Sequence, residues 1–190
     1  MGLRAVQNPI PSLYCSTRRE PRAYPLIRRH ADAYGNLGAR TDYAINGGSS
    51  TEAGSRGGDA RGENIVLAND GIWALGRQTA IKKTYLVGEK AMDTLKYTTG
   101  DDHGDRAPVA GLVDNFGAAN SYVRFAARQA SKDVAENCHA CHDFGSAHAS
   151  TWNVTMADGS VRSLSYAMDV LTHRALASIN GEEPVSASDL

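Results

Sequence analysis

The feature that most constrains the fold is an Asp-Gly pair, Asp158-Gly159, which separates two alternating stretches of the chain. Apolar and polar residues alternate over 152–156, and a second alternating stretch follows over 161–166. An Asp-Gly pair in this position favours the tight turn that joins two antiparallel strands. The C-terminal part of the chain is therefore predicted to form a β-hairpin.

Other local patterns predict short strands and helices separated by long loops. Apolar runs that end at turn-forming residues predict strands over 64–67 and 84–87. Helical spacing predicts a short helix over 89–97, a longer one over 121–136 and a last one after Asp169, which is a suitable N-cap. The expected fold class is α+β: a single domain with an antiparallel β-sheet, the C-terminal hairpin, short helices and long loops.

The domain is expected to cover residues 1–190 and to begin with an extended arm. Four prolines punctuate residues 1–40, and each removes a backbone donor and favours extended geometry in the residue before it. Residues 1–40 are therefore predicted to be an extended, Pro/Arg-rich arm, and residues 41–190 the globular part. The arm carries a basic cluster that is expected to form a solvated face or salt bridges between subunits: Arg18, Arg19, Arg22, Arg28 and Arg29.

The composition excludes several classes of protein. Hydrophobic residues make up 42% of the 190 residues and charged residues 22%, which excludes wholesale disorder. The formal net charge of −1 lacks the excess of positive charge that is typical of nucleic-acid-binding proteins. The sequence has no run of about eighteen apolar residues, so no transmembrane segment is predicted, and its first residues lack the apolar core of a secretory signal.

The most specific motif is Cys-x-x-Cys-His, formed by Cys138, Cys141 and His142. This is the attachment pattern of c-type haem. Two thiols at this spacing can reach the two vinyl groups of one porphyrin, and the imidazole that follows can bind the iron. Cys138 and Cys141 are therefore predicted to form the thioethers of one covalently attached haem c, with His142 as the proximal iron ligand.

Two haem-free alternatives remain open for the same residues. The cysteines could close a Cys138–Cys141 disulfide or stay as free thiols. They could also form part of a zinc site completed by His139, His142 or His148. Zinc sites usually draw their ligands from two separated pairs, whereas these residues form one compact cluster. The haem interpretation rests on the attachment rule itself.

No catalytic site is predicted, and the chain is not expected to be an enzyme. Ser146 lies near His148, but no G-x-S-x-G surrounds it and no acid is assigned to orient the histidine. Asp101, Asp102 and Asp105 lack the spaced ligands and the closing glutamate of a calcium-binding loop. A solvated turn is expected there instead.

Several segments resemble a known family of secreted proteins. His148 is followed, after nine residues, by Asp158-Gly159. Further matches fall in the family's order: Ser12–Arg18, Asp42-Tyr43, Asn46–Gly48, Thr84–Lys90, Gly100–Asp102, Phe144–His148 and Asn180–Glu182. The chain is therefore similar to the globular part of the secreted pseudopilin-like family named for its H-x9-D-G signature. The resemblance covers nearly the whole chain but not the family's hydrophobic prepilin helix, and it does not itself imply haem.

The resemblance implies a pilin-like globular domain, export from the cytoplasm and self-association, and it carries over no catalytic residues. Together with the haem motif it predicts an extracellular or cell-surface c-type cytochrome that carries one haem and transfers electrons. Because a single haem passes electrons only to a close neighbour, subunits are expected to assemble into a homopolymer, as a filament or tube. The rival expectation is a haem-free structural pilin-like subunit. The redox partners and the export route are not given by the sequence.

The second axial ligand of the haem iron is not fixed by the sequence. His30 and His103 lie outside the segments that carry the resemblance, and they are the candidates, from this subunit or another. His148 and Cys15 match family positions and are explained as a structural hydrogen-bonding residue and a buried small apolar residue. His173, on the last helix, is expected at the surface. The methionines are further candidates, of which the last two are expected to fill the core: Met92, Met156 and Met168.

Overall fold

The computed structural model describes residues 3–27, 29–49, 70–72, 84–108, 119–136 and 142–179. Its helices are short: α1 Leu3–Gln7, η1 Pro11–Leu13, α2 Arg29–Tyr34, η2 Thr94–Lys96, α4 Ala119–Tyr122 and α5 Val170–Ala177, where η marks a 3-10 helix. Its strands are β1 Tyr24–Pro25, β2 Leu37–Gly38, β3 Tyr43–Asn46, β4 Tyr85–Glu89, β5 Val123–Arg124, β6 Ser131–Lys132, β7 Gly145–Ser146, β8 Thr151–Met156 and β9 Val161–Ser165. The predicted α+β fold class is confirmed. No helix among the described residues is both long and apolar enough to cross a membrane.

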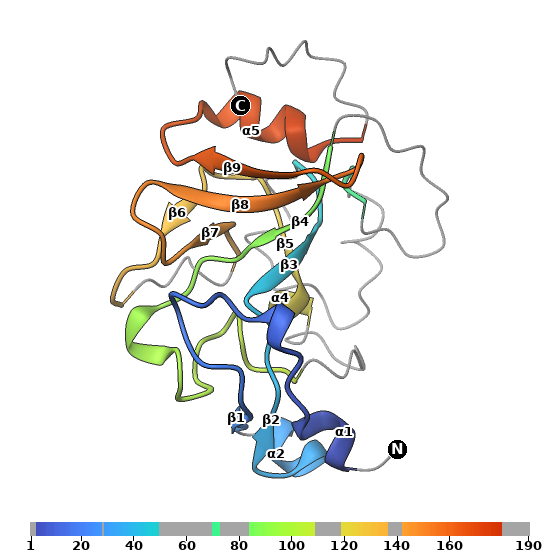
Figure 1. Cartoon of the computed structure of the whole chain (residues 1–190), viewed down its shortest axis with the longest axis vertical. Helices are drawn as coiled ribbons and strands as arrows, with labels where there is room; N and C mark the ends of the chain where they lie inside the picture. The colour runs from blue at the N-terminus through green and yellow to red at the C-terminus, as the bar shows by residue number, and fades with distance from the viewer. Residues whose placement is uncertain are drawn as a thin grey trace.

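Within the described residues, the largest sheet has five strands in the order β5-β3-β4-β8-β9. Neighbouring strands pair antiparallel, except for β3 and β5, which run parallel. Figure 1 shows α5 beside the end of this sheet formed by β8 and β9, and α1, α2, β1 and β2 at the opposite end of the molecule. Strand β4 confirms the strand predicted over 84–87, whereas the strand predicted over 64–67 lies outside the described residues.

The predicted C-terminal hairpin is confirmed as β8 and β9. The two strands pair antiparallel, with Trp152 opposite Leu164. At the turn, the Asp158 carboxylate accepts hydrogen bonds from the backbone and the side chain of Ser160, at 2.8 and 2.7 Å. Gly159 has a φ of +84°, a left-handed conformation that glycine adopts without a Cβ clash. The Asp-Gly pair thus supplies both the acceptor and the backbone freedom that this turn needs.

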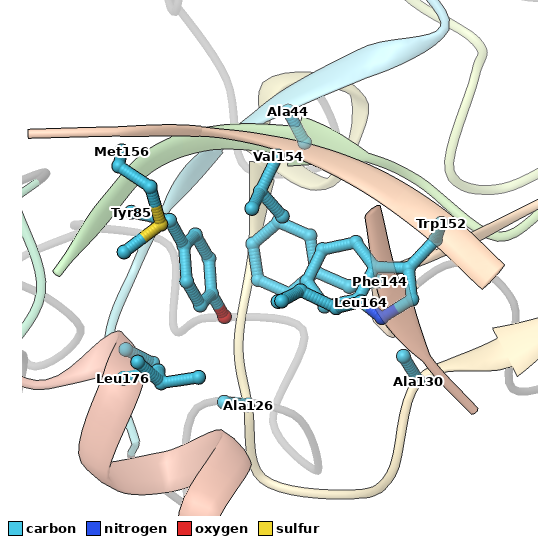
Figure 2. Packing of buried hydrophobic residues seen from close by; sticks show 11 residues of the cluster. Ala44, Tyr85, Ala126, Ala130, Phe144, Trp152, Val154, Met156, Leu164 and Leu176 are labelled. Carbon is cyan, nitrogen blue, oxygen red and sulfur yellow. The ribbon is translucent and has the colours of Figure 1, made fainter. Parts of the chain in front are cut away.

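The hydrophobic core lies between the hairpin, β4 and α5 (Figure 2). Tyr85, Phe144 and Trp152 form an aromatic trio with ring centroids 5.2 to 5.6 Å apart. Leu176 of α5 closes the cluster from the helix side. Helix α5 begins at the predicted cap, where the Asp169 carboxylate accepts backbone hydrogen bonds from the first turn. Local capping and long-range packing therefore agree on the position of α5.

One residue of α5, His173, lies in the core, so its prediction as a surface residue is wrong. It is 2% exposed, and its ring centroid lies 5.3 Å from that of Trp152. Its Nδ1 lies 3.1 Å from the carbonyl oxygen of Arg128, and its Nε2 lies 3.1 Å from the Tyr85 hydroxyl. Because a carbonyl only accepts, Nδ1 carries the proton and Nε2 accepts from Tyr85. Helical spacing could not reveal these partners, which come from distant segments.

Acidification is expected to destabilise the fold through His173. Burial, which disfavours the charged imidazolium, lowers the pKa of His173 from 6.5 to about 4. The unfolded chain therefore takes up this proton before the folded chain does, and the fold loses on the order of 3 kcal/mol as the pH falls from about 6.5 to about 4. Urea unfolding across this range should show a smaller loss for His173→Gln than for the wild type. Equal losses in the two proteins would contradict the prediction.

The helix predicted over 121–136 is wrong. Helix α4 ends at Tyr122, and the chain continues as β5, a turn and β6. The backbone N–H of Phe125 donates to the carbonyl of His142 at 3.4 Å, and that of Ala126 donates to the carbonyl of Gly48 at 2.9 Å. These tertiary partners replace the bonds that a helix would make. The short helix predicted over 89–97 is likewise reduced to η2, because β4 continues through the start of that range.

Residues 3–40 do not form the extended arm that the prolines predicted. The segment contains α1, η1 and α2, and β1 pairs with β2. Arg18 and Arg19, predicted to be solvated or to bridge subunits, are buried. Arg18 Nε lies 2.9 Å from Asp133 Oδ2, and Arg19 Nη2 lies 2.6 Å from Asp42 Oδ1. Carboxylates from distant parts of the chain neutralise these guanidinium groups, and a local charge pattern does not reveal such partners.

The acidic residues at 101–105 do not form the solvated turn that was predicted. Asp105 is buried and contacts two cations, Arg19 Nη1 at 2.5 Å and Lys90 Nζ at 2.8 Å. Asp102 is also buried and accepts two backbone hydrogen bonds. These contacts belong to a buried ion network that joins the N-terminal residues to the sheet and consists of Arg18, Arg19, Asp42, Lys90, Asp105 and Asp133.

Candidate functional site

The two cysteines of the haem motif, Cys138 and Cys141, lie outside the described residues, as does His139. The structure describes the chain on both sides of them. Before the motif, Glu136 has a φ of +56°, and its backbone N–H donates to the Asp93 carboxylate at 3.1 Å. The chain that leads into the motif is thereby fixed to the loop that follows β4.

After the motif, His142 is half-buried and begins a stretch that several contacts hold in place. Its carbonyl oxygen accepts from the backbone N–H of Phe125 at 3.4 Å. The carbonyl oxygen of Asp143 accepts from the backbone N–H of Ala91 and from Arg124 Nε, both at 3.1 Å. The imidazole predicted to bind the haem iron therefore stands on a backbone that the sheet positions.

The motif lies in the connection between two parallel strands, β6 and β7. Ser131 pairs with Gly145, and Lys132 pairs with Ser146. The approach is so close that a Cβ on Gly145 would meet the Ser131 carbonyl oxygen at 1.8 Å, so only glycine fits there. The chain thus leaves β6 and returns to β7 at neighbouring points, and the described residues on both sides of the motif are anchored to the fold.

The two predicted distal ligands lie in different parts of the fold. His103 is exposed on the loop that follows η2. One guanidinium links this loop to the motif, because Arg124 donates to the carbonyls of Gly104 and Asp143, at 3.1 Å each. His30 is buried in α2, which lies with β1 and β2 at one end of the molecule, away from β6 and β7 (Figure 1). Within one subunit, the loop of His103, and not α2, lies next to the chain that follows the motif.

The methionines considered as distal ligands lie inside the molecule. Met156 belongs to the core cluster, and Met168 packs against it. Met92 is fully buried, and its backbone N–H donates to the Asp133 carboxylate at 2.8 Å. The interpretation of Met156 as a core residue is confirmed, whereas Met168 is only partly buried at the margin of the core.

A second group of reactive side chains, which the sequence did not predict as a site, consists of Cys15, Glu89 and His148. Cys15 follows η1, Glu89 ends β4 and His148 precedes β8. His148 Nε2 lies 3.8 Å from Cys15 Sγ and 3.2 Å from Glu89 Oε1. The three atoms all lie within 4.8 Å of one another. We call these three residues the Cys-Glu-His cluster.

Hydrogen bonds hold each member of the cluster in position. The backbone N–H of Cys15 donates to Asp42 Oδ2 at 2.8 Å. Glu89 Oε2 accepts a hydrogen bond from the backbone of β8 at 2.7 Å. The backbone N–H of His148 donates to Ser146 Oγ at 3.1 Å. Asp42 also belongs to the buried ion network, so this one residue contacts both the cluster and the network. The sheet positions both groups.

Most of the cluster is shielded from water. Cys15 is 3% exposed and Glu89 is 0% exposed, whereas the His148 side chain is 29% exposed. Burial raises the pKa of the Cys15 thiol. Glu89 Oε1 is buried and faces only His148 Nε2, at 3.2 Å, and the Cys15 thiol. A buried carboxylate oxygen in this position costs free energy unless a positive charge lies beside it.

The sequence correctly predicted the individual roles of Cys15 and His148. It did not predict that these two residues and Glu89 lie together in the fold. Cys15 is buried, and His148 makes hydrogen bonds, as predicted. The signal that could have joined them is that Cys15, Glu89 and His148 each lie in a different segment carrying the resemblance. The signature itself has a simple structural basis. Its histidine stands at the cluster end of β8, and Asp158 forms the hairpin turn at the other end.

The chain was compared with known protein families, with curated proteins and with solved structures. The family described as a protein of unknown function, DUF1559, matches residues 2–171. No curated protein and no solved structure matches the chain. The match includes the haem motif, the Cys-Glu-His cluster and most of the described fold.

Proposed function

The chain belongs to the DUF1559 family of proteins of unknown function, which is associated with pilin-like proteins. We propose that it is a pilin-like subunit that carries one covalent haem c. In this proposal the protein is exported, acts at the cell surface or beyond it, and transfers electrons without catalysing a reaction of its own. The observation that carries the proposal is the Cys-x-x-Cys-His motif, together with the anchoring of the described residues that precede and follow it.

The residues at and around the motif fit a haem. Cys138 and Cys141 supply two thiols for the thioether bonds, and His142 supplies a nitrogen for the iron. Two large apolar side chains beside the segment that leads into the motif, Leu95 and Val134, are 63% and 50% exposed. A backbone hydrogen bond at 3.3 Å joins η2 to Val134, so these side chains lie on neighbouring stretches. They offer an apolar surface to a porphyrin. When bound, the haem supplies a one-electron redox couple.

For the distal position, the proposal prefers His103 over His30. Arg124 joins the loop of His103 to the chain that follows His142, with hydrogen bonds of 3.1 Å at both ends. His30 lies in α2, which Figure 1 shows near the end of the molecule that holds β1 and β2, away from β6 and β7. A His30 ligand would therefore have to come from another subunit.

Self-association into a homopolymer is part of the proposal, because a single haem passes electrons only to a close neighbour. Within the described residues, β9 is an edge strand of the five-stranded sheet. An edge strand offers backbone groups with which a second copy can pair. Exposed apolar side chains lie there and on the adjoining helix, with Val161 71% exposed and Leu171 66% exposed. Arg18 and Arg19 pair internally and do not supply the contacts between subunits.

Intact mass and absorption spectra of the chain, produced by export in a host that attaches c-type haem, test the proposal. The wild type is expected to gain the mass of one haem and to show a reduced α-band that survives acid-acetone extraction. The double variant Cys138→Ser/Cys141→Ser is expected to lose both. Cys15→Ser, which alters the thiol outside the motif, is the matched control and should retain both.

A wild-type chain with neither the haem mass nor the α-band would contradict the proposal. The protein would then be a haem-free structural pilin-like subunit with a Cys138–Cys141 disulfide or a metal site. The same preparation serves to examine assembly by negative-stain imaging. Filaments or tubes are expected, and monomers alone at high concentration would remove the assembly from the proposal while leaving the haem.

A further inference from the structure

We propose that the Cys-Glu-His cluster binds a zinc-class divalent cation, with Cys15 Sγ, Glu89 Oε1 and His148 Nε2 as its ligands. A thiolate, a carboxylate and an imidazole are the donor types that bind zinc in proteins. The three donors come from segments that are far apart in the sequence and that the fold brings together. The site uses no residue of the haem motif, so it stands independently of the proposed electron transfer.

Two of the three separations between the donor atoms are close to those of a tetrahedral zinc centre, and the third is within 4.8 Å. Zinc–ligand bonds of about 2.0 to 2.3 Å place neighbouring donors in a tetrahedron about 3.3 to 3.6 Å apart. In the cluster, the distance from His148 Nε2 to Glu89 Oε1 is 3.2 Å, and that from Nε2 to Cys15 Sγ is 3.8 Å. Small side-chain adjustments therefore bring the donors around a common ion.

The contacts of His148 distinguish a metal site from a nucleophilic catalytic site. In a catalytic triad, the histidine contacts the nucleophile through one ring nitrogen and the acid through the other. Here Cys15 Sγ and Glu89 Oε1 both face Nε2, whereas Nδ1 lies 3.5 Å from Thr17 Oγ1. One ring nitrogen carries either one proton or one lone pair, so it cannot serve both partners. A cation placed between the three atoms serves them all.

The burial of Glu89 is a second, independent reason. Its Oε2 accepts from the backbone N–H of Asn153, and its Oε1 faces only the other two members of the cluster, with His148 Nε2 at 3.2 Å and the Cys15 thiol beside it. Because the residue is 0% exposed, water does not solvate that oxygen. A compensating positive charge stabilises a buried carboxylate. A divalent cation at the cluster supplies it.

The position of His148 gives the ion a route to solvent. Its side chain is 29% exposed, whereas the other two ligands are buried. Three protein ligands leave the fourth tetrahedral position for water, as in open zinc sites. Polar groups adjoin the cluster, with Thr17 Oγ1 3.1 Å from Cys15 Sγ and Asn153 Nδ2 3.3 Å from His148 Nε2. These neighbours orient the ligands and a bound water.

Cobalt(II) is the probe for the test, because a cobalt–thiolate bond gives a near-ultraviolet charge-transfer band in addition to visible d–d bands. The full chain carrying Cys138→Ser and Cys141→Ser removes the competing thiols of the haem motif. This chain is expected to bind one equivalent of Co2+ with a thiolate band that added Zn2+ abolishes. Zn2+ is also expected to raise its Tm, because the ion binds the folded chain only.

Substitutions in that background assign the ligands. Cys15→Ser is expected to lose the thiolate band, and Glu89→Gln and His148→Gln are expected to weaken Co2+ binding by more than about tenfold. Glu89→Gln keeps the size of the side chain and an oxygen for the hydrogen bond from β8, and circular dichroism checks that each variant is folded. Glu20→Gln, which alters an exposed carboxylate outside the cluster, is the matched control for Glu89→Gln and should bind Co2+ as its parent does.

Absence of the thiolate band from the Cys138→Ser/Cys141→Ser chain would overturn the proposal. Unchanged Co2+ affinity in folded Glu89→Gln and His148→Gln chains would do the same. Neither result bears on haem attachment, which is measured on the wild-type chain. The two proposals can therefore fail separately.

Discussion

Replacing Asp105 with asparagine is expected to lower the free energy of unfolding by about 3–5 kcal/mol, because the change leaves buried Lys90 without its counter-ion and buried Arg19 with Asp42 alone. Asp105 contacts Arg19 Nη1 at 2.5 Å and Lys90 Nζ at 2.8 Å, and all three side chains are at most 3% exposed. Asparagine keeps the size of the side chain and removes only its charge. Urea unfolding at pH 7 measures the loss.

The same prediction has a pH dependence. Burial by itself would raise the pKa of Asp105, but Arg19 and Lys90 outweigh burial and hold the pKa well below its ordinary value. The stabilising effect of the charged carboxylate is therefore complete above about pH 3.9 and is lost only as the pH falls below that value. Burial lowers the pKa of Lys90 to about 8 although Asp105 raises it, so Asp105→Asn lowers the Lys90 pKa further and the difference between wild type and variant should widen as the pH falls from 7 to 5.

The matched control for this substitution is Asp101→Asn. Asp101 lies in the same loop and pairs with Arg106 at 3.1 Å, but its side chain is 50% exposed. An exposed ion pair contributes less than about 1 kcal/mol. If Asp105→Asn costs no more than Asp101→Asn, the buried ion network does not have the role assigned to it.

Replacing Trp152 with alanine is expected to cost about 3–5 kcal/mol, the range for deleting a large aromatic side chain from a packed core. Trp152 is 1% exposed and stacks on Phe144 with ring centroids 5.2 Å apart. It also packs against Gly88, where an added Cβ would meet the indole at 2.6 Å. The surrounding sheet is fixed by its hydrogen bonds, so it cannot close the cavity. Thermal and urea unfolding measure the loss.

Val161→Ala is the control for the core substitution. Val161 lies on β9 of the same hairpin but is 71% exposed, so its truncation should change the stability by less than about 0.5 kcal/mol. A Trp152→Ala chain as stable as Val161→Ala would contradict the described core. Both variants keep the Asp-Gly turn, so the comparison isolates the packing.

The parts of the fold that were predictable have causes within a few residues. The hairpin follows from the Asp158-Gly159 turn and alternation, and α5 begins where Asp169 caps it. The helix predicted over 121–136 failed for the opposite reason. Its apolar spacing is helical, but the backbone of Phe125 bonds to the distant chain after the haem motif. Local spacing does not register a partner of that kind.

The two candidate sites differ in the same way: one is local in the sequence and the other depends on distant segments. The haem motif is complete in a short stretch of sequence, so its attachment chemistry was predictable, and the structure adds the anchoring of the chain on both sides. The Cys-Glu-His cluster could not be predicted as a site. Cys15 reaches it through its backbone bond to Asp42, and Glu89 and His148 meet because β4 pairs with β8.

By itself, the amino-acid sequence determined the α+β class, the hairpin turn, the cap of the last helix and a spacing suited to covalent haem. Only the tertiary structure decided that Arg18 and Arg19 are buried ion partners, that His173 belongs to the core and that three reactive side chains share one site. The physical reason is the range of the interactions. Turns, caps and motif spacings depend on neighbours along the chain, whereas burial and charge pairing depend on segments that meet only when the whole sheet has formed.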